Sequence, residues 1–233
     1  MKEKSTAYNP KEVEGRIYKS WEKSGYFNPD KQPNIKKGQT PFTVVIPPPN
    51  ITGSLHMGHA LNNTIQDILA RQSRMQGNPT LWVPGTDHAG IATQNVVEKM
   101  LAKKDVKRRD LGEKKFVEEI WSWKKKYGST IINQLKQMGC SCDWSRERFT
   151  MDADYAKAVE TAFRHYYKKG WIYQGVRVIN WCTRCQTSLS DLEVEHEERK
   201  AKFYYFKYDK HFPITIATTR PETKLGKCLS YLK

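Results

Sequence analysis

Two histidines, His56 and His59, are the side chains in this sequence best placed to do chemistry. They stand where an expected strand, residues 42–46, ends in three prolines and an expected amphipathic helix begins. In open α/β sheets, ligands bind in the crevice at that end of a strand. A helix N-terminus there offers N–H groups and a positive dipole end to phosphate.

Such a site could grip the phosphates of ATP and stabilise the charge that develops on the α-phosphate. Gly58, between the histidines, leaves room for a ligand to approach the backbone. The attacking carboxylate would already be ionised, so positioning and electrostatics would be enough. On spacing alone, His56 and His59 could equally form half of a metal site or be satisfied within a turn.

Asp87 closely follows the next expected strand, residues 80–83. A carboxylate at the carboxyl end of a strand could pair with the ammonium group of an amino acid. Aspartate is also a favoured helix N-cap, and spacing alone favours the cap.

Cys182 and Cys185 are spaced as half of a tetrahedral zinc site. Cys140 and Cys142 have the wrong spacing to complete it, and Cys228 stands alone. A redox pair is the alternative, although the flanking residues do not suggest one. With five cysteines and no secretory signal, we expect reduced thiols or a metal site rather than disulfides.

The apolar pattern predicts the elements that must position these residues. Strand, helix and strand follow one another over residues 42–83, with Leu61, Ile65, Ile68, Leu69 and Met75 on one helix face. This βαβ unit implies a parallel sheet whose first strand is buried. Further expected elements are a helical lead-in at 8–28, a linker at 30–41, helices at 116–138 and 155–166, and strands at 176–181, 203–206 and 213–216.

The composition suits a soluble protein with a polyanionic partner. Forty Lys and Arg against 25 Asp and Glu give a formal charge of +15, with clusters at 103–109 and 124–126. Each cluster alone is better explained as a solvated helix face. The sequence has no apolar run long enough to cross a membrane and no signal peptide, so we expect a cytoplasmic protein without a membrane partner.

The string Pro-Pro-Pro-Asn-Ile-Thr-Gly-Ser-Leu-His-Met-Gly-His, residues 47–59, resembles the class I aminoacyl-tRNA synthetases, whose first signature is His-x-Gly-His. The longer string is similar to the valyl group, which usually has Val in place of Ile51. Three further stretches carry the same resemblance, in the same order: residues 85–94, 180–185 and 217–223.

The resemblance implies roles for particular residues. His56 and His59 would be catalytic. The ATP-binding residues would be Asn50, Thr52, Gly53, His56, Gly58 and His59, and the amino-acid-binding residues Pro48, Pro49, Asn50 and Asp87. Thr218, Thr219 and Arg220 would open an editing domain that hydrolyses wrongly attached threonine, and Cys182 and Cys185 would be half of a zinc site.

The resemblance also implies an α/β fold: the first half of a Rossmann-like parallel sheet followed by the start of a β-rich editing domain. Residues 1–40 would be the lead-in and linker, 41–185 the first half of the catalytic domain, and 186–233 the start of the editing domain. The activity would be ATP-dependent activation of valine and its transfer to tRNA(Val), with Mg²⁺ and, where the full-length enzyme completes the zinc site, Zn²⁺. The enzyme would be monomeric at full length.

Family members are several times longer and carry a second signature, Lys-Met-Ser-Lys-Ser, that this sequence lacks. After Thr223 the agreement ends. We therefore expect a truncated chain that does not sustain valine activation by itself. Two alternatives stay open: a non-catalytic tRNA- or partner-binding fragment, and another nucleotidyl-transferring enzyme with a His-x-Gly-His crevice.

Overall fold

The computed structural model describes residues 7–207, 209–211 and 213–222. The chain divides into two compact units, residues 1–174 and 175–233, which are considered separately. The predictions made for Thr223 and Cys228 concern residues outside the described part of the chain.

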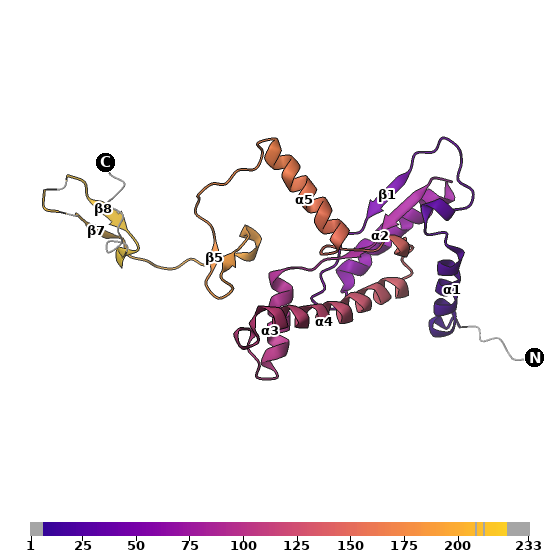
Figure 1. The fold of residues 1–233 in the computed structure, drawn as a ribbon, viewed down its shortest axis with the longest axis horizontal. Coiled ribbons are helices and arrows are strands. Elements are labelled where there is room, and N and C mark those ends of the chain that lie inside the picture. The colour runs from indigo at the N-terminus through magenta and orange to yellow at the C-terminus, as the bar shows by residue number, and fades with distance from the viewer. Residues whose placement is uncertain (1–6, 208, 212, 223–233) are drawn as a thin grey trace, which may run out of the picture. The chain divides into compact units, whose positions relative to one another are not determined.

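The predicted βαβ unit is confirmed in the first unit (Figure 1). Strand β1 (Phe42–Val45) leads into helix α2 (Met57–Met75), which returns to strand β2 (Thr80–Val83). The two strands pair in parallel, with Phe42 opposite Thr80 and Val45 opposite Val83. A second parallel pair joins β3 (Gly85–Thr86) to β4 (Arg148–Phe149).

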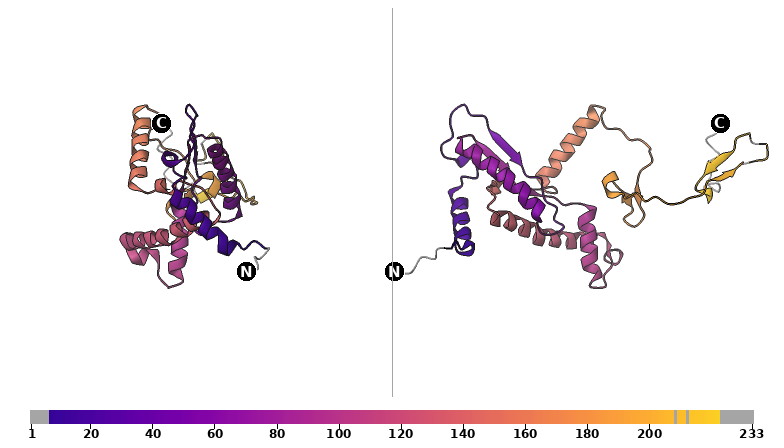
Figure 2. Two further views of the ribbon diagram at one scale, coloured as in Figure 1. Left: turned by 90° about the vertical axis from the view of Figure 1, so that its right-hand side faces the viewer. Right: turned by 180° about the vertical axis from the view of Figure 1, so that it is seen from behind.

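The predicted long helix is α4 (Arg108–Gln137), interrupted by Gly112 at φ 73° and ψ 170°. Helix α3 (Ile91–Ala102) packs against its first half, where Val97, Leu101 and Phe116 form a small core (Figure 2). The second half of α4 contributes Ile131 and Leu135 to the main core, whose other buried members are Ile46, Ile51, Ala70, Trp82, Cys140 and Cys142.

The predicted lead-in is a helix, α1 (Pro10–Ser24), and it packs on the main core. The Tyr18 hydroxyl donates to the carbonyl of Cys140 at 2.7 Å and accepts from the Trp144 indole at 2.8 Å. Lys136, in the last turn of α4, pairs with Glu22 at 2.7 Å. Two short 3₁₀ helices, Pro29–Lys31 and Trp144–Arg146, lie in the connections of this unit.

Burial differs from the sequence expectation in two places. Strand β1 was predicted to be buried, but its residues alternate between half-buried and exposed, because successive side chains point to opposite faces of the sheet and one of those faces is uncovered in the described structure. On α2, the apolar residues Leu61, Ile65 and Ile68 are 66%, 52% and 60% exposed, while Asn63, Ala70 and Ser73 are buried.

Helix α5 (Ala153–Lys168) confirms another predicted helix. The Asp152 side chain caps its start by accepting from the backbone N–H of Tyr155 at 2.7 Å, and Gly170 follows its end at φ 73°. Its apolar row is exposed: Val159 and Phe163 are each 55% accessible.

The second unit contains two short antiparallel pairs. Strand β5 (Trp181–Cys182) pairs with β6 (Thr187–Ser188), and β7 (Tyr204–Phe206) pairs with β8 (Ile216–Thr218). A 3₁₀ helix, Asp191–Glu193, follows β6. The prediction of a strand at 176–181 was wrong for residues 176–180, which lie outside any strand of the described structure; Val178 is 99% exposed. Of the two strands predicted from residue 203 onward, the first is confirmed as β7, whereas the second was predicted at 213–216 and lies at Ile216–Thr218.

Candidate active site at the first strand–helix crossover

His56 and His59 face each other across the first turn of α2. His56 is the N-cap, and the two ring centroids are 3.9 Å apart. The Nδ1 atom of His56 accepts from the backbone N–H of Gly58 at 3.1 Å, and Nδ1 of His59 accepts from the backbone N–H of His56 at 3.3 Å. Because Nδ1 is an acceptor in both rings, the neutral imidazoles carry their proton on Nε2. Each histidine therefore presents an Nε2–H donor that can serve a ligand.

A cleft of about 540 Å³ lies beside these histidines. It brings together all six residues predicted to bind ATP, and three of the four predicted to bind the amino acid, Asp87 being the exception. The lining residues are Pro47, Pro48, Pro49, Asn50, Thr52, Gly53, Ser54, Leu55, His56, Gly58, His59 and Asn62. The N-terminal end of α2, which favours negative charge, opens on this cleft.

Gly58 is required by the histidines themselves as well as by any ligand. A Cβ at this position would lie 3.0 Å from Cε1 and 3.1 Å from Nδ1 of His56. A larger residue would push the His56 ring out of the arrangement that fixes its tautomer.

The pKa of His59 is lowered, first because the ring is partly desolvated and second because His56 lies beside it. His59 therefore remains neutral to lower pH than a solvated histidine. Near neutral pH, His59 would therefore bind an anionic ligand through a hydrogen bond rather than through a full positive charge.

Asp87 is not a helix cap: α3 begins after Gly90, which occupies the N-cap position. One carboxylate oxygen of Asp87, Oδ1, accepts from the backbone N–H of Ala89 at 3.0 Å and from the hydroxyl of Thr150 at 3.1 Å. It also lies 3.3 Å from Nδ1 of His88. The side chain is 34% exposed, so it stays accessible to a ligand.

Backbone bonds join Asp87 to the loop before the histidines. The N–H of Asp87 donates to the carbonyl of Pro49, and the N–H of Ile51 donates to the carbonyl of Asp87, each at 2.9 Å. Asn50 and Asp87 thus form a parallel bridge beyond the ends of the two strand pairs. The two constellations predicted separately from the sequence are thus adjacent in the structure.

Three residues that support this site were missed from the sequence. Thr150 holds Asp87 and also accepts from the backbone N–H of His88 at 2.9 Å. Trp123 and Gln134, both on α4, hydrogen-bond to the loop backbone. Nothing in the single sequence marks these polar groups, because Trp123 falls in the apolar row of its helix and the other two lie among ordinary polar residues.

The predicted cysteine pair lies in the second unit. Cys182 ends β5, and its Sγ accepts from the backbone N–H of Cys185 at 3.4 Å. Hydrogen bonds from Cys185 lower the pKa of Cys182, which favours the thiolate that a metal would bind. However, no three His, Cys, Asp or Glu side chains gather as a metal centre within residues 7–207, 209–211 and 213–222. Cys182 and Cys185 thus remain two ligands, fewer than a tetrahedral site needs.

The predicted editing residues also lie in the second unit. Thr218 ends β8, and its hydroxyl accepts from the backbone N–H of Arg220 at 3.0 Å. Thr219 is exposed, and the Arg220 guanidinium pairs with Glu222 at 3.0 Å. The hydroxyls and the guanidinium thus lie in one turn.

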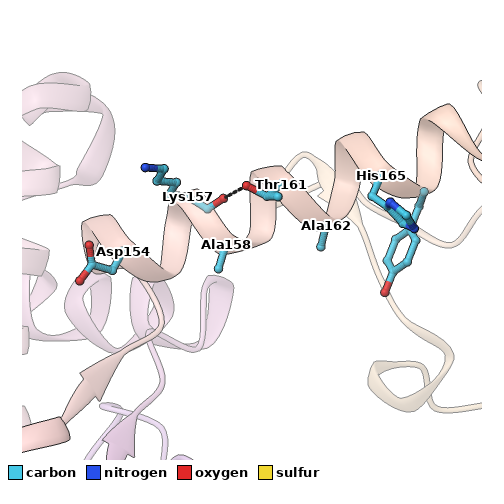
Figure 3. Close-up of a pocket in the computed structure, with 7 residues that line it drawn as sticks. Asp154, Lys157, Ala158, Thr161, Ala162 and His165 are labelled. Carbon is cyan, nitrogen blue, oxygen red and sulfur yellow. Dashed lines mark hydrogen bonds between the residues drawn. The ribbon is translucent and has the colours of Figure 1, made fainter.

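A hollow of about 610 Å³ runs along α5 (Figure 3). All its lining residues belong to that one helix: Asp154, Lys157, Ala158, Thr161, Ala162, His165 and Tyr166. The Thr161 hydroxyl is bonded to the carbonyl of Lys157, as the dashed line in Figure 3 marks. No second element contributes a side chain, and we do not treat this surface as the active site.

The fold and the cleft together define an α/β protein with a candidate ligand site at a strand–helix crossover, and comparison with known proteins identifies its family. Residues 16–220 match the family of tRNA synthetases class I (I, L, M and V), and the chain belongs to this family. The particular relatives are valine–tRNA ligases. This chain is 54% identical to the enzyme of Syntrophotalea carbinolica over 224 residues, which cover 94% of this chain and 24% of the relative.

Other relatives agree. Identity is 54% over 230 residues with the valine–tRNA ligase of Thermotoga maritima, covering 97% of this chain and 26% of that enzyme. It is 55% over 217 residues with the chloroplastic/mitochondrial valine–tRNA ligase 2 of Arabidopsis thaliana, covering 91% and 22%. The chain thus spans about a quarter of the length of these relatives.

Among solved structures, the chain is similar to the agnB2 LeuRS of Agrobacterium radiobacter K84, seen in a ternary complex with tRNA and LeuAMS. The TM-score is 0.61 at 22% identity, over 79% of this chain and 21% of that one. This likeness confirms the predicted fold class. In the described part of the chain, every helix is too short or too polar to cross a membrane.

Proposed function

We propose that this chain carries the first part of the active site of a valine–tRNA ligase, which activates valine with ATP and transfers it to tRNA(Val). The observation that carries the proposal is the cleft at His56 and His59, bridged through the backbone to Asp87. An ATP site and an amino-acid site must be adjacent for this reaction, because the valine carboxylate attacks the α-phosphorus as pyrophosphate leaves.

Each group at the site has a task in this reaction. The Nε2–H donors of His56 and His59, with the N-terminal end of α2, would stabilise the charge that develops on the α-phosphate. Asn50, Thr52 and Gly53 would contact the nucleotide. Asp87, fixed by Thr150, would pair with the valine ammonium, and Pro48 and Pro49 would line the amino-acid side.

Mg²⁺ and Zn²⁺ would be bound in different ways. No carboxylate is among the residues that line the cleft, so Mg²⁺ would be held mainly by the phosphates of ATP, as is usual for this ion. Zinc at Cys182 and Cys185 would need two further ligands beyond those described, and we assign it no part in the reaction.

The remaining parts of the proposal concern the longer enzyme. Thr218, Thr219 and Arg220 would open its editing domain, where mischarged threonine is hydrolysed. The domain boundaries at 40/41 and 185/186, a monomeric state and a cytoplasmic location follow the same family pattern. The net charge of +15 suits the tRNA partner.

The experiment is a segment exchange. This chain replaces the matching 224-residue segment of the Syntrophotalea carbinolica enzyme, and valine-dependent ATP–pyrophosphate exchange is measured. We expect exchange with valine, and a loss of roughly 100-fold in both His56→Ala and His59→Ala, because each removes a donor aimed at developing charge. His196→Ala, which removes an exposed histidine of the second unit, is the matched control.

Asp87→Asn tests the amino-acid side of the same chimera. It should raise the valine concentration needed for half-maximal exchange far more than the ATP concentration. A soluble, folded chimera that activates another amino acid, or none, would rule out the proposal. Full activity in both histidine variants would remove them from the mechanism.

A further inference from the structure

We propose that Trp123 and Gln134 of α4 are positioning residues that clamp the backbone of the loop before His56 and so hold the catalytic histidines in place. They touch neither a substrate nor a reacting atom. The catalytic consequence rests on the proposed function, whereas the clamp itself can be tested without it.

Trp123 holds the middle of the loop. Its indole N–H donates to the carbonyl of Ile51 at 2.7 Å, and Ile51 is only 1% exposed. The indole is fixed in turn by stacking on Tyr127, with ring centroids 4.0 Å apart and planes inclined by 25°. Since the N–H of Ile51 donates to Asp87, both backbone groups of this residue are bound.

Gln134 holds the end of the loop. Its Oε1 accepts from the backbone N–H of Leu55 at 2.9 Å, and Leu55 directly precedes the N-cap His56. Gln134 lies between residues of the main core: Ile131 and Leu135 on the same helix are fully buried. The amide is therefore carried by a part of α4 that cannot shift without disturbing the core.

The two bonds come from one rigid face. Trp123 and Gln134 are eleven residues apart, which in an α-helix is about three turns and a rise of about 16 Å. Thr52 and Gly53, which line the cleft, lie between the two clamped residues of the loop, Ile51 and Leu55. The helix thus fixes the cleft wall from outside, which is the kind of support that a site relying on preorganised donors needs.

The alternative is that both bonds merely satisfy buried polar groups. Trp123→Phe keeps an aromatic ring that can stack on Tyr127 and removes the hydrogen-bond donor. Gln134→Met keeps the length of the side chain and removes the acceptor, while Gln134→Glu retains it. The matched controls on the same helix are Trp121→Phe, at a residue that is 49% exposed, and Gln137→Met, at an exposed residue.

The first measurement uses the 233-residue chain and NMR. In the unaltered chain, the Leu55 amide should exchange slowly with solvent and His59 should titrate below an ordinary histidine. In Gln134→Met, the Leu55 amide should lose protection. In Gln134→Met and in Trp123→Phe, the pKa of His59 should rise towards 6.5. Gln134→Glu, which retains the acceptor, should keep the protection of the Leu55 amide, and both controls should leave both values unchanged.

The second measurement uses the chimeric enzyme. Trp123→Phe and Gln134→Met should each lower kcat for pyrophosphate exchange by about ten-fold or more, because small misplacements of a reacting group are costly. Each variant also leaves one loop backbone group without its partner, so the free energy of unfolding should fall by about 1–3 kcal/mol, and kcat is compared under conditions in which every variant is folded. Unchanged His59 titration together with activity within two-fold of the parent in both variants would overturn the proposal. If the parent chimera does not activate valine, the proposed function is wrong. The NMR measurement still tests whether Trp123 and Gln134 hold the loop in place.

Discussion

Helices α2 and α4 pack against the same core, but α4 does so with apolar side chains and α2 mainly with polar ones. Helix α4 buries apolar side chains there, Ile131 and Leu135, both fully inaccessible. On α2, the large apolar residues Leu61, Ile65 and Ile68 face solvent. The side that α2 turns to the core carries Ala70 and a series of polar groups.

Most of those polar groups on α2 are hydrogen-bonded, although Oδ1 of Asn63 and Nε of Arg74 are buried without a partner in the described structure. Asp67 accepts from the backbone N–H of Ser141 at 2.9 Å and from Nε of Arg71 at 2.6 Å. Gln66 accepts from the Trp82 indole at 3.0 Å, and the side chains of Ser73 and Thr80 are bonded at 2.9 Å. At α2, hydrogen bonds therefore take the place of apolar burial. The loss of stability on removing one of them depends on the buried partner that is left unsatisfied.

The largest expected effect comes from the α4 side. Leu135→Ala should lower the free energy of unfolding by about 2–5 kcal/mol, through lost burial and a cavity in a close-packed core. Leu61→Ala on α2 is the matched control and should change it by less than about 0.5 kcal/mol. Urea unfolding followed by tryptophan fluorescence measures both. Equal losses in the two variants would contradict the assignment of faces.

A smaller loss is expected when the polar network is broken. Asp67→Ala should cost about 1–3 kcal/mol, because it leaves the N–H of Ser141 without its acceptor and removes the ion pair with Arg71. Gln72→Ala, at an exposed position of the same helix, should be nearly neutral. If Asp67→Ala unfolds with the midpoint of the parent, hydrogen bonding is not what attaches α2 to the core.

The contrast explains which parts of the fold the sequence could predict. Apolar periodicity places α2, α4 and α5 correctly, since the spacing reports a helix whatever later covers it. The same periodicity cannot say that a given apolar row is buried. On α2 the buried side is chosen by partners distant in sequence, such as Trp82 and Ser141, and no local pattern encodes those pairings.

The candidate site, like the fold, could be predicted from the sequence only in part. The string at residues 47–59 marks the cleft because the prolines, Gly58 and the histidines are adjacent in sequence. Asp87 could be read either as a ligand or as a cap. Its exclusion as a cap depended on the start of α3 after Gly90, which pattern alone places only to within a few residues.

Alkaline pH should weaken the core shared by the two helices. Burial raises the pKa of the Cys140 thiol to about 12 from 9.0, and burial also raises the pKa of Cys142. Since the unfolded thiols ionise first, this stability is fully present below about pH 9 and is lost as pH rises towards the folded value. Each thiol should contribute about 1.4 kcal/mol of loss per pH unit in that window.

Urea unfolding at pH 8, 9 and 10 measures this loss. Cys140→Ala should remove the part of the slope that belongs to Cys140, whereas Cys185→Ala, in the second unit, should leave the slope of the first unit unchanged. A pH-independent free energy of unfolding between pH 9 and 10 would show that the thiols are accessible in the folded chain.

The smallest effect on stability should come from the outer face of α2, where the change is expected in association instead. Leu61, Ile65 and Ile68 recur at intervals of three and four residues and are all more than half exposed, so they form one apolar row. Contiguous exposed apolar surface of this kind drives association.

Replacing Leu61, Ile65 and Ile68 with glutamine should change the free energy of unfolding by no more than about 0.5 kcal/mol per site. Sedimentation velocity at rising concentration should show the unaltered chain self-associating and the triple variant doing so less. A loss of several kcal/mol in the triple variant would mean that this row is buried in the folded molecule after all, and the contrast between α2 and α4 would then fail.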